Sequence, residues 1–184
     1  DLAGFAVGVV DKSKIISGKK IKNNHVILGI ESSGPHSNGY SLIRKILSRH
    51  KPPSAVLKTL LKPTHLYTSM VNDVMKKNIK VSGIANITGG GITENIPRII
   101  PKDLAADIDL NGWKFPKAFQ WLQEKGKISN EDMLRIFNCG IGLAIILPLS
   151  EVKLLENLAS KYKFKTHRIG RIVKRTQAEL TYLN

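Results

Sequence analysis

Apolar residues follow two patterns that alternate along the chain. Short runs rich in Val, Ile and Leu predict buried strands, and apolar residues three and four positions apart predict amphipathic helices. The expected strands cover residues 5–10, 26–30, 81–87, 104–110, 140–147, 165–173 and 179–183. The expected helices cover residues 39–50, 55–61, 68–77, 116–125, 131–137 and 151–162, with a helical turn over 93–100. This alternation predicts an α/β fold in which helices cover a sheet.

Residues at three helix ends predict boundaries. Asn130 is expected to cap the helix over 131–137, and Ser150 the helix over 151–162. Gly126 is expected to follow the end of the helix over 116–125.

The chain has the size and composition of one folded domain. It contains 184 residues, of which 42% are hydrophobic and 23% charged, so it can bury a core and is not expected to be disordered. No apolar run reaches the ~20 residues that a membrane-spanning helix needs, so we expect no membrane partner. The single cysteine, Cys139, excludes an internal disulfide and favours a reducing, cytoplasmic location. Because no histidine lies near it in sequence, buried packing is favoured over a nucleophilic role.

The net charge of +15 favours anionic partners. The lysines are scattered along the chain, however, and aromatic residues make up only 6% of it. A nucleic-acid interface more often combines a concentrated basic stripe with stacking aromatics. A generally basic surface is therefore favoured over nucleic-acid binding, and an anionic small substrate is compatible with either interpretation.

The first candidate site is a loop rich in small and polar residues between a buried strand and an amphipathic helix. Gly34 and Gly39 let its backbone curl closely around a ligand, and side-chain donors come from Ser33, Ser37 and Asn38. The start of a helix offers unpaired N–H groups and a positive dipole end to an anion. The sequence favours a phosphate-binding loop over a plain helix-capping turn.

A second loop, also between a strand and a helical turn, contains three consecutive glycines. Gly89, Gly90 and Gly91 can form a concave nest of N–H groups, and Thr88 and Thr93 add hydroxyls. Neither loop is a Walker A motif, because no Gly-Lys-Ser/Thr follows it. Two such loops indicate a ligand with more than one anchoring group.

Two titratable residues in these loops are catalytic candidates. His36 either exchanges a proton with a ligand or pins its loop by a hydrogen bond, and the sequence leaves both roles open. Glu94 could act as a base or hold an amine, or it could cap the helix, and Asn95 beside it is a binding candidate. No spacing of His, Cys, Asp and Glu predicts a protein-bound metal.

Several long motifs together resemble the aminoimidazole ribonucleotide synthetase family, also called phosphoribosylformylglycinamidine cyclo-ligases. The match begins with Ser-Ser-Gly-Pro-His-Ser-Asn-Gly-Tyr-Ser-Leu at 32–42 and continues with Thr-Gly-Gly-Gly-Ile-Thr-Glu-Asn-Ile-Pro-Arg at 88–98. It includes Phe-Asn-Cys-Gly-Ile-Gly at 137–142, and further matches lie at 1–10, 119–123 and 169–170. Leu143 stands where the family commonly has methionine, which is compatible with a core substitution. The resemblance covers essentially the whole chain.

The resemblance implies that the chain is the C-terminal half of such an enzyme. Residues 1–10 are then the last strand of a preceding ATP-binding domain, and residues 11–184 form a C-terminal α/β (α+β-like) domain with a mixed sheet. The implied activity is ATP-dependent ring closure of formylglycinamidine ribonucleotide in purine (IMP) biosynthesis. ATP and Mg would be held mostly by the preceding domain, which would also form most of a homodimer. The chain alone is expected to be inactive or nearly so.

The resemblance also implies that the two loops face the cleft between the domains. One of them would hold a substrate phosphate, with His36 and Glu94 near the reacting amidine.

Two other classes of function remain open: a related ATP-dependent enzyme, such as formylglycinamidine ribonucleotide synthetase, selenophosphate synthetase or thiamine-monophosphate kinase, and a non-catalytic anion- or RNA-binding module.

Overall fold

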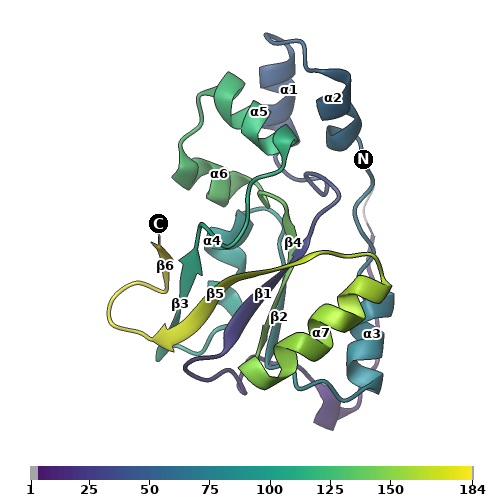
Figure 1. Cartoon of the computed structure of the whole chain (residues 1–184), viewed down its shortest axis with the longest axis vertical. Helices are drawn as coiled ribbons and strands as arrows, with labels where there is room; N and C mark the ends of the chain where they lie inside the picture. Colours follow the sequence, from purple (N-terminus) through teal and green to yellow (C-terminus); the bar gives the residue numbers. More distant parts are fainter. Residues whose placement is uncertain (1–3, 184) are drawn as a thin grey trace.

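The apolar runs of the sequence pair into one mixed sheet, in a computed structural model that describes residues 4–183 (Figure 1). Its strands are β1 (Val26–Glu31), β2 (Gly83–Asn86), β3 (Leu104–Asp109), β4 (Ile141–Leu147), β5 (Thr166–Lys174) and β6 (Leu180–Leu183). They are arranged in the order β2-β4-β1-β5-β3-β6. Neighbouring strands are antiparallel except β3 and β6, which are parallel. The expected α/β class and mixed sheet are confirmed.

Helices cover both faces of this sheet. One layer contains α1 (Tyr40–Leu47), α2 (Ser54–Leu60), α4 (Gly91–Asn95), α5 (Lys117–Gly126) and α6 (Asn130–Ile136). The other contains α3 (Thr68–Lys76) and α7 (Leu149–Lys161), which lie together at the lower right of Figure 1. The 3-10 turns are η1 (Lys12–Lys14) and η2 (Pro97–Ile99). Within residues 4–183, no helix is both long enough and apolar enough to cross a membrane.

Strand β4 separates two hydrophobic cores. Because successive strand side chains point to opposite faces, Ala144 and Ile146 pack with the α1, α2, α4, α5 and α6 layer. Leu143, Ile145 and Leu147 pack with α3 and α7 on the other face. All seven residues of β4 are buried, which explains why its sequence is continuously apolar instead of alternating.

The register of β4 brings two loops to the same end of the sheet. Strand β4 is antiparallel to both β1 and β2. Leu143 pairs with Ile30 near the end of β1 and with Asn86 at the end of β2. The chain therefore leaves β1 and β2 at the same level, on the two sides of the start of β4.

The strand expected over residues 5–10 is not formed among residues 4–10, and residues 1–3 lie outside the described part. Phe5, Val7 and Val9 are 99%, 98% and 102% exposed. A strand needs a neighbouring strand for its hydrogen bonds, and among residues 4–183 this segment has none. Its assignment to a preceding domain stays a prediction.

The three expected helix boundaries are also wrong. The N-cap of α6 is Ser129, whose Oγ accepts a hydrogen bond from the Asp132 amide at 3.0 Å. Gly126 is the last residue of α5, and Lys127 after it takes the left-handed conformation. Helix α7 begins directly after Pro148, without a side-chain cap. Each boundary is displaced by one or two residues, as is common at helix ends.

Candidate functional site

The loop after β1 is held in shape mainly by its own backbone and by His36. The His36 Nε2 atom accepts hydrogen bonds from the amides of Ser33 at 3.0 Å and His65 at 3.3 Å. Ser33 Oγ donates to the Pro63 carbonyl at 2.6 Å, so this hydroxyl is engaged within the protein. Asn38 Nδ2 donates to the His36 carbonyl at 2.8 Å. The loop is therefore preorganised, and Ser37 at its tip is exposed.

Two glycines of this loop are required for different reasons. Gly34 lies so close to α2 that a Cβ atom would be 2.4 Å from the Thr59 carbonyl oxygen. Gly39 has a φ of 73° and directly precedes α1, and a Cβ there would be 2.3 Å from the Phe137 ring. Close packing requires glycine at both positions, and the positive φ adds to this requirement at Gly39.

Asn138, just before β4, ties the first loop to the sheet. Its side chain is fully buried. Asn138 Nδ2 donates to the Gly34 carbonyl at 2.8 Å, and Oδ1 accepts from the Gly140 amide at 2.9 Å and from Ser32 Oγ at 3.1 Å. Asn138 is not among the site residues predicted from the sequence. The available signal was the position of this polar side chain between the apolar Phe137 and Cys139, shortly before Gly140.

Asn95 performs the same task in the triple-glycine loop. Its Nδ2 donates to the carbonyls of Gly91 at 2.8 Å and Gly89 at 3.1 Å. Its Oδ1 accepts from Thr88 Oγ1 at 3.3 Å. Asn95 is buried and faces its own loop, so it shapes the backbone that a ligand would contact.

Two of the three glycines have left-handed backbone angles, and the nest expected from them stays a prediction. Gly90 and Gly91 have φ values of 92° and 57°. A Cβ on Gly91 would be 2.0 Å from the Leu134 carbonyl oxygen, whereas on Gly89 the nearest atom would be Asn38 Oδ1 at 3.9 Å. The last contact also shows that the two loops adjoin each other.

Glu94 lies over the triple-glycine loop among arginines. Its carboxylate forms ion pairs with Arg98 at 3.1 Å and Arg135 at 3.7 Å, and its side chain is 43% exposed. A Cβ on Gly90 would be 2.5 Å from Glu94 Oε2. The carboxylate thus covers the glycine backbone. Arg135 on α6 is a second residue of this region that is not among those predicted from the sequence. Because Arg135 and Glu94 lie far apart in the sequence, no local pattern indicates that their side chains meet.

A cavity of about 990 Å³ opens beside Glu94. Thr93 and Tyr182 face it and share a hydrogen bond of 2.6 Å between their hydroxyls. Arg98 and Arg175 also line it, but the loop after β1 does not. The hollow is thus lined by residues of the second loop and of the β3–β6 edge, although the two loops adjoin each other.

His36 is electrically neutral over a wide pH range. Burial, and then the nearby charge of His65, lower the pKa of His36 from 6.5 to about 4. Because Nε2 accepts two amide hydrogen bonds, the proton of the neutral ring is on Nδ1. Both hydrogen bonds hold the loop in place, so this geometry favours the loop-pinning role of His36 over proton exchange with a ligand.

This pKa predicts a pH dependence of stability. The unfolded chain binds a proton at His36 below about pH 6.5, whereas the folded chain does so only near pH 4, so acidification favours unfolding in this window. The His36→Gln variant is expected to lose stability less steeply than the parent between these pH values. Thermal unfolding at a series of pH values measures this, and equal slopes for the two proteins would contradict it.

Two expectations about chemistry outside the loops can be compared with the structure. Cys139 is fully buried, and burial raises the pKa of its thiol, which confirms packing in place of a nucleophilic role. Among residues 4–183, no group of three or more His, Cys, Asp or Glu side chains is placed to hold a metal ion.

Comparison with known families gives a match over most of the chain. The family described as "AIR synthase related protein, C-terminal domain" matches residues 22–183. A phosphoribosylformylglycinamidine cyclo-ligase from Neisseria meningitidis is 42% identical over 95% of this chain and 53% of its own length. One from Coxiella burnetii is 48% identical over 87% of this chain and 47% of its own length. The chain thus spans about half the length of these curated relatives.

Solved structures resemble the fold at low sequence identity. Thiamine-monophosphate kinase from Stenotrophomonas maltophilia K279a has a TM-score of 0.66 at 15% identity, covering 94% of this chain and 54% of that one. T. maritima PurL complexed with AMPPCP has a TM-score of 0.61 at 12% identity, covering 95% of this chain and 26% of that one. These likenesses support the fold alone.

Proposed function

Since this chain belongs to the family of AIR synthase related proteins, C-terminal domain, we propose that it is the C-terminal part of a phosphoribosylformylglycinamidine cyclo-ligase. The curated relatives of that name are 42–48% identical to it. Thiamine-monophosphate kinase and PurL share the fold but are only 15% and 12% identical to this chain, so related enzymes of these kinds are weaker candidates. In this proposal the protein acts in purine biosynthesis in the cytoplasm and forms a homodimer in its full-length form.

The observation that carries the proposal is the meeting of the two preorganised loops at one end of the sheet. The substrate, formylglycinamidine ribonucleotide, has a phosphate at one end and a formylglycinamidine group at the other, so it needs two anchoring regions. Backbone amides around Gly90 and at the start of α1 suit the phosphate. Arg98 and Arg135 lie close enough to neutralise further negative charge beside Glu94.

ATP supplies the phosphoryl group that activates the formyl oxygen of the substrate for ring closure. The described residues fit a phosphate through their amides at the two loops. In this proposal Mg and most of the ATP site belong to the preceding domain. His36 holds the first loop in position. Glu94 is the exposed carboxylate near the glycines that can exchange a proton with the amidine.

A chimera tests this function directly. The chain is joined to the N-terminal part of the Coxiella burnetii relative in place of that protein's own C-terminal part. The chimera is expected to consume formylglycinamidine ribonucleotide and ATP and to release ADP and phosphate, measured by coupled assay and product chromatography. A folded chimera without this activity, beside an active parent, would contradict the proposal.

The isolated chain is expected to give no measurable turnover with the same substrate, ATP and Mg. Catalysis of phosphoryl transfer depends on positioning and charge stabilisation, which need the complete nucleotide site. Turnover close to that of the chimera would show that the described residues hold the whole site.

A further inference from the structure

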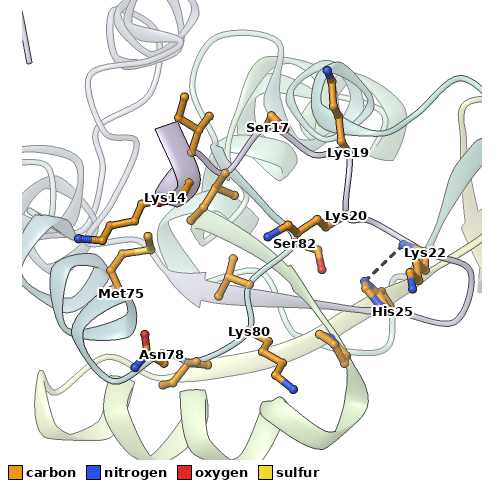
Figure 2. Close-up of a pocket in the computed structure, with 16 residues that line it drawn as sticks. Lys14, Ser17, Lys19, Lys20, Lys22, His25, Met75, Asn78, Lys80 and Ser82 are labelled. Carbon is orange, nitrogen blue, oxygen red and sulfur yellow. Dashed lines mark hydrogen bonds between the residues drawn. The ribbon is translucent and has the colours of Figure 1, made fainter. Parts of the chain in front are cut away.

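A second hollow lies at the end of the sheet opposite to the two loops. It is formed where β1 and β2 begin and β4 ends, and its volume is about 650 Å³ (Figure 2). This volume lies within the range typical of pockets for small molecules, roughly 300–1,000 Å³. The proposed cyclo-ligase chemistry makes no use of this pocket.

The pocket is strongly basic. Lysine and histidine side chains line it: Lys14, Lys19, Lys20, Lys22, Lys80 and His25. Lys14 pairs with Asp11 at 2.7 Å, but within residues 4–183 no such ion pair is formed by the other four lysines. Figure 2 shows Lys19 pointing away from the other labelled side chains and Lys20 extending toward Ser82. Burial and the charge of Lys22 lower the pKa of His25, which is in keeping with an excess of positive charge.

The remainder of the lining is largely apolar. The contributing side chains are Ile15, Ile16, Met75, Ile79, Val81 and Pro148. Apart from His25, no aromatic side chain of the described residues 4–183 lines the pocket. A surface that binds single-stranded nucleic acid usually offers aromatic rings for stacking. This combination of charge, apolar walls and concave shape therefore favours a small molecule.

The backbone that carries Lys19 and Lys20 is held in one conformation by its own contacts. Gly18 has a φ of 80°, and the Ile21 amide donates to its carbonyl at 2.9 Å, which closes a turn around Lys19 and Lys20. Ile21 is buried, and a Cβ on Gly18 would be 2.1 Å from the Ile99 carbonyl oxygen. Preorganisation of this turn reduces the backbone entropy that would be lost on binding.

We propose that this pocket binds a phosphorylated small molecule that also carries an apolar ring, of the mononucleotide class. The phosphate lies among Lys20, Lys22 and Lys80, and the ring packs on the apolar wall near Met75. The proposal is independent of the cyclo-ligase function, because it rests on different residues at the other end of the sheet.

The methionines provide a direct probe of this pocket. The chain has three, Met70, Met75 and Met133, and of these only Met75 lines the pocket, whereas the other two are buried in the cores. In a chain labelled with methionine ¹³C-methyl groups, AMP is expected to shift the NMR signal of Met75 and to leave the other two in place. Adenosine is expected to cause no shift at the same concentration. AMP binding without a shift of Met75 would overturn the proposal.

Matched charge variants identify the contacts. Lys20→Glu/Lys80→Glu is expected to weaken AMP binding at least about tenfold, because charge-assisted contacts are lost. Lys58→Glu/Lys161→Glu changes the net charge equally at exposed lysines outside the pocket and is expected to retain the affinity. Equal weakening in both variants would overturn the proposal, because it would show a general field effect. Tighter binding of an RNA oligonucleotide than of AMP at the same residues would also overturn it.

Discussion

The Asn138→Ala variant is expected to lose about 3 kcal/mol of its free energy of unfolding. The side chain is fully buried and makes hydrogen bonds of 2.8 Å to Gly34, 2.9 Å to Gly140 and 3.1 Å to Ser32. Alanine leaves the Gly34 carbonyl and the Gly140 amide without these partners, at a cost of about 1–3 kcal/mol for each buried group. Urea unfolding followed by fluorescence measures the change.

Two further variants show whether the hydrogen bonds of Asn138 cause this loss. Asn138→Asp keeps the acceptor but turns a carboxyl oxygen toward the Gly34 carbonyl, so it is expected to be destabilising as well. Asn111→Ala, in an exposed turn, is expected to change the free energy of unfolding by less than about 0.5 kcal/mol. A loss below about 1 kcal/mol for Asn138→Ala would show that Asn138 does not hold the loop.

The Gly90→Ala variant is expected to weaken phosphate binding at the two loops at least about tenfold, because it disturbs the nest at its centre. The φ of 92° at Gly90 is strained for any side chain, and the added Cβ would be 2.5 Å from Glu94 Oε2. An energy difference of about 1.4 kcal/mol suffices for a tenfold effect. The affinity of the chain for formylglycinamidine ribonucleotide, measured by calorimetry, checks this expectation.

Gly89 provides the matched control from the same loop. It has no positive φ, and an added Cβ would have only Asn38 Oδ1 within 4 Å, at 3.9 Å. Gly89→Ala is therefore expected to retain the fold and most of the affinity. If both variants bound the substrate as well as the parent does, the interpretation of this loop as a phosphate nest would be wrong.

The sequence predicted the sheet well because burial leaves a local signal. The continuous apolar run of β4 and the helical spacing in α1 are readable within ten residues, and both elements formed where expected. The segment over residues 5–10 shows the limit of this approach. Its alternating pattern suits a strand, but pairing requires a neighbour that no local pattern can reveal.

The candidate site was predictable in its backbone but not in its supports. The glycines indicated both loops, because a positive φ or a close backbone approach restricts a position to glycine. The role of Asn138 depends on contacts with residues more than 100 positions away, and that of Arg135 on the packing of α6 against α4. Such long-range contacts arise only when the sheet has assembled. His36 was open between two roles, and its two amide contacts favour the anchor.

The most direct test of the central claim is a calorimetric titration of this chain with formylglycinamidine ribonucleotide and with its dephosphorylated nucleoside. The Lys20→Glu/Lys80→Glu variant is used, so that the basic pocket does not contribute. We expect the nucleotide to bind and the nucleoside to show no measurable affinity, because the two loops hold the substrate phosphate. Equal binding of both compounds, or binding of neither, would contradict a phosphate site in these loops.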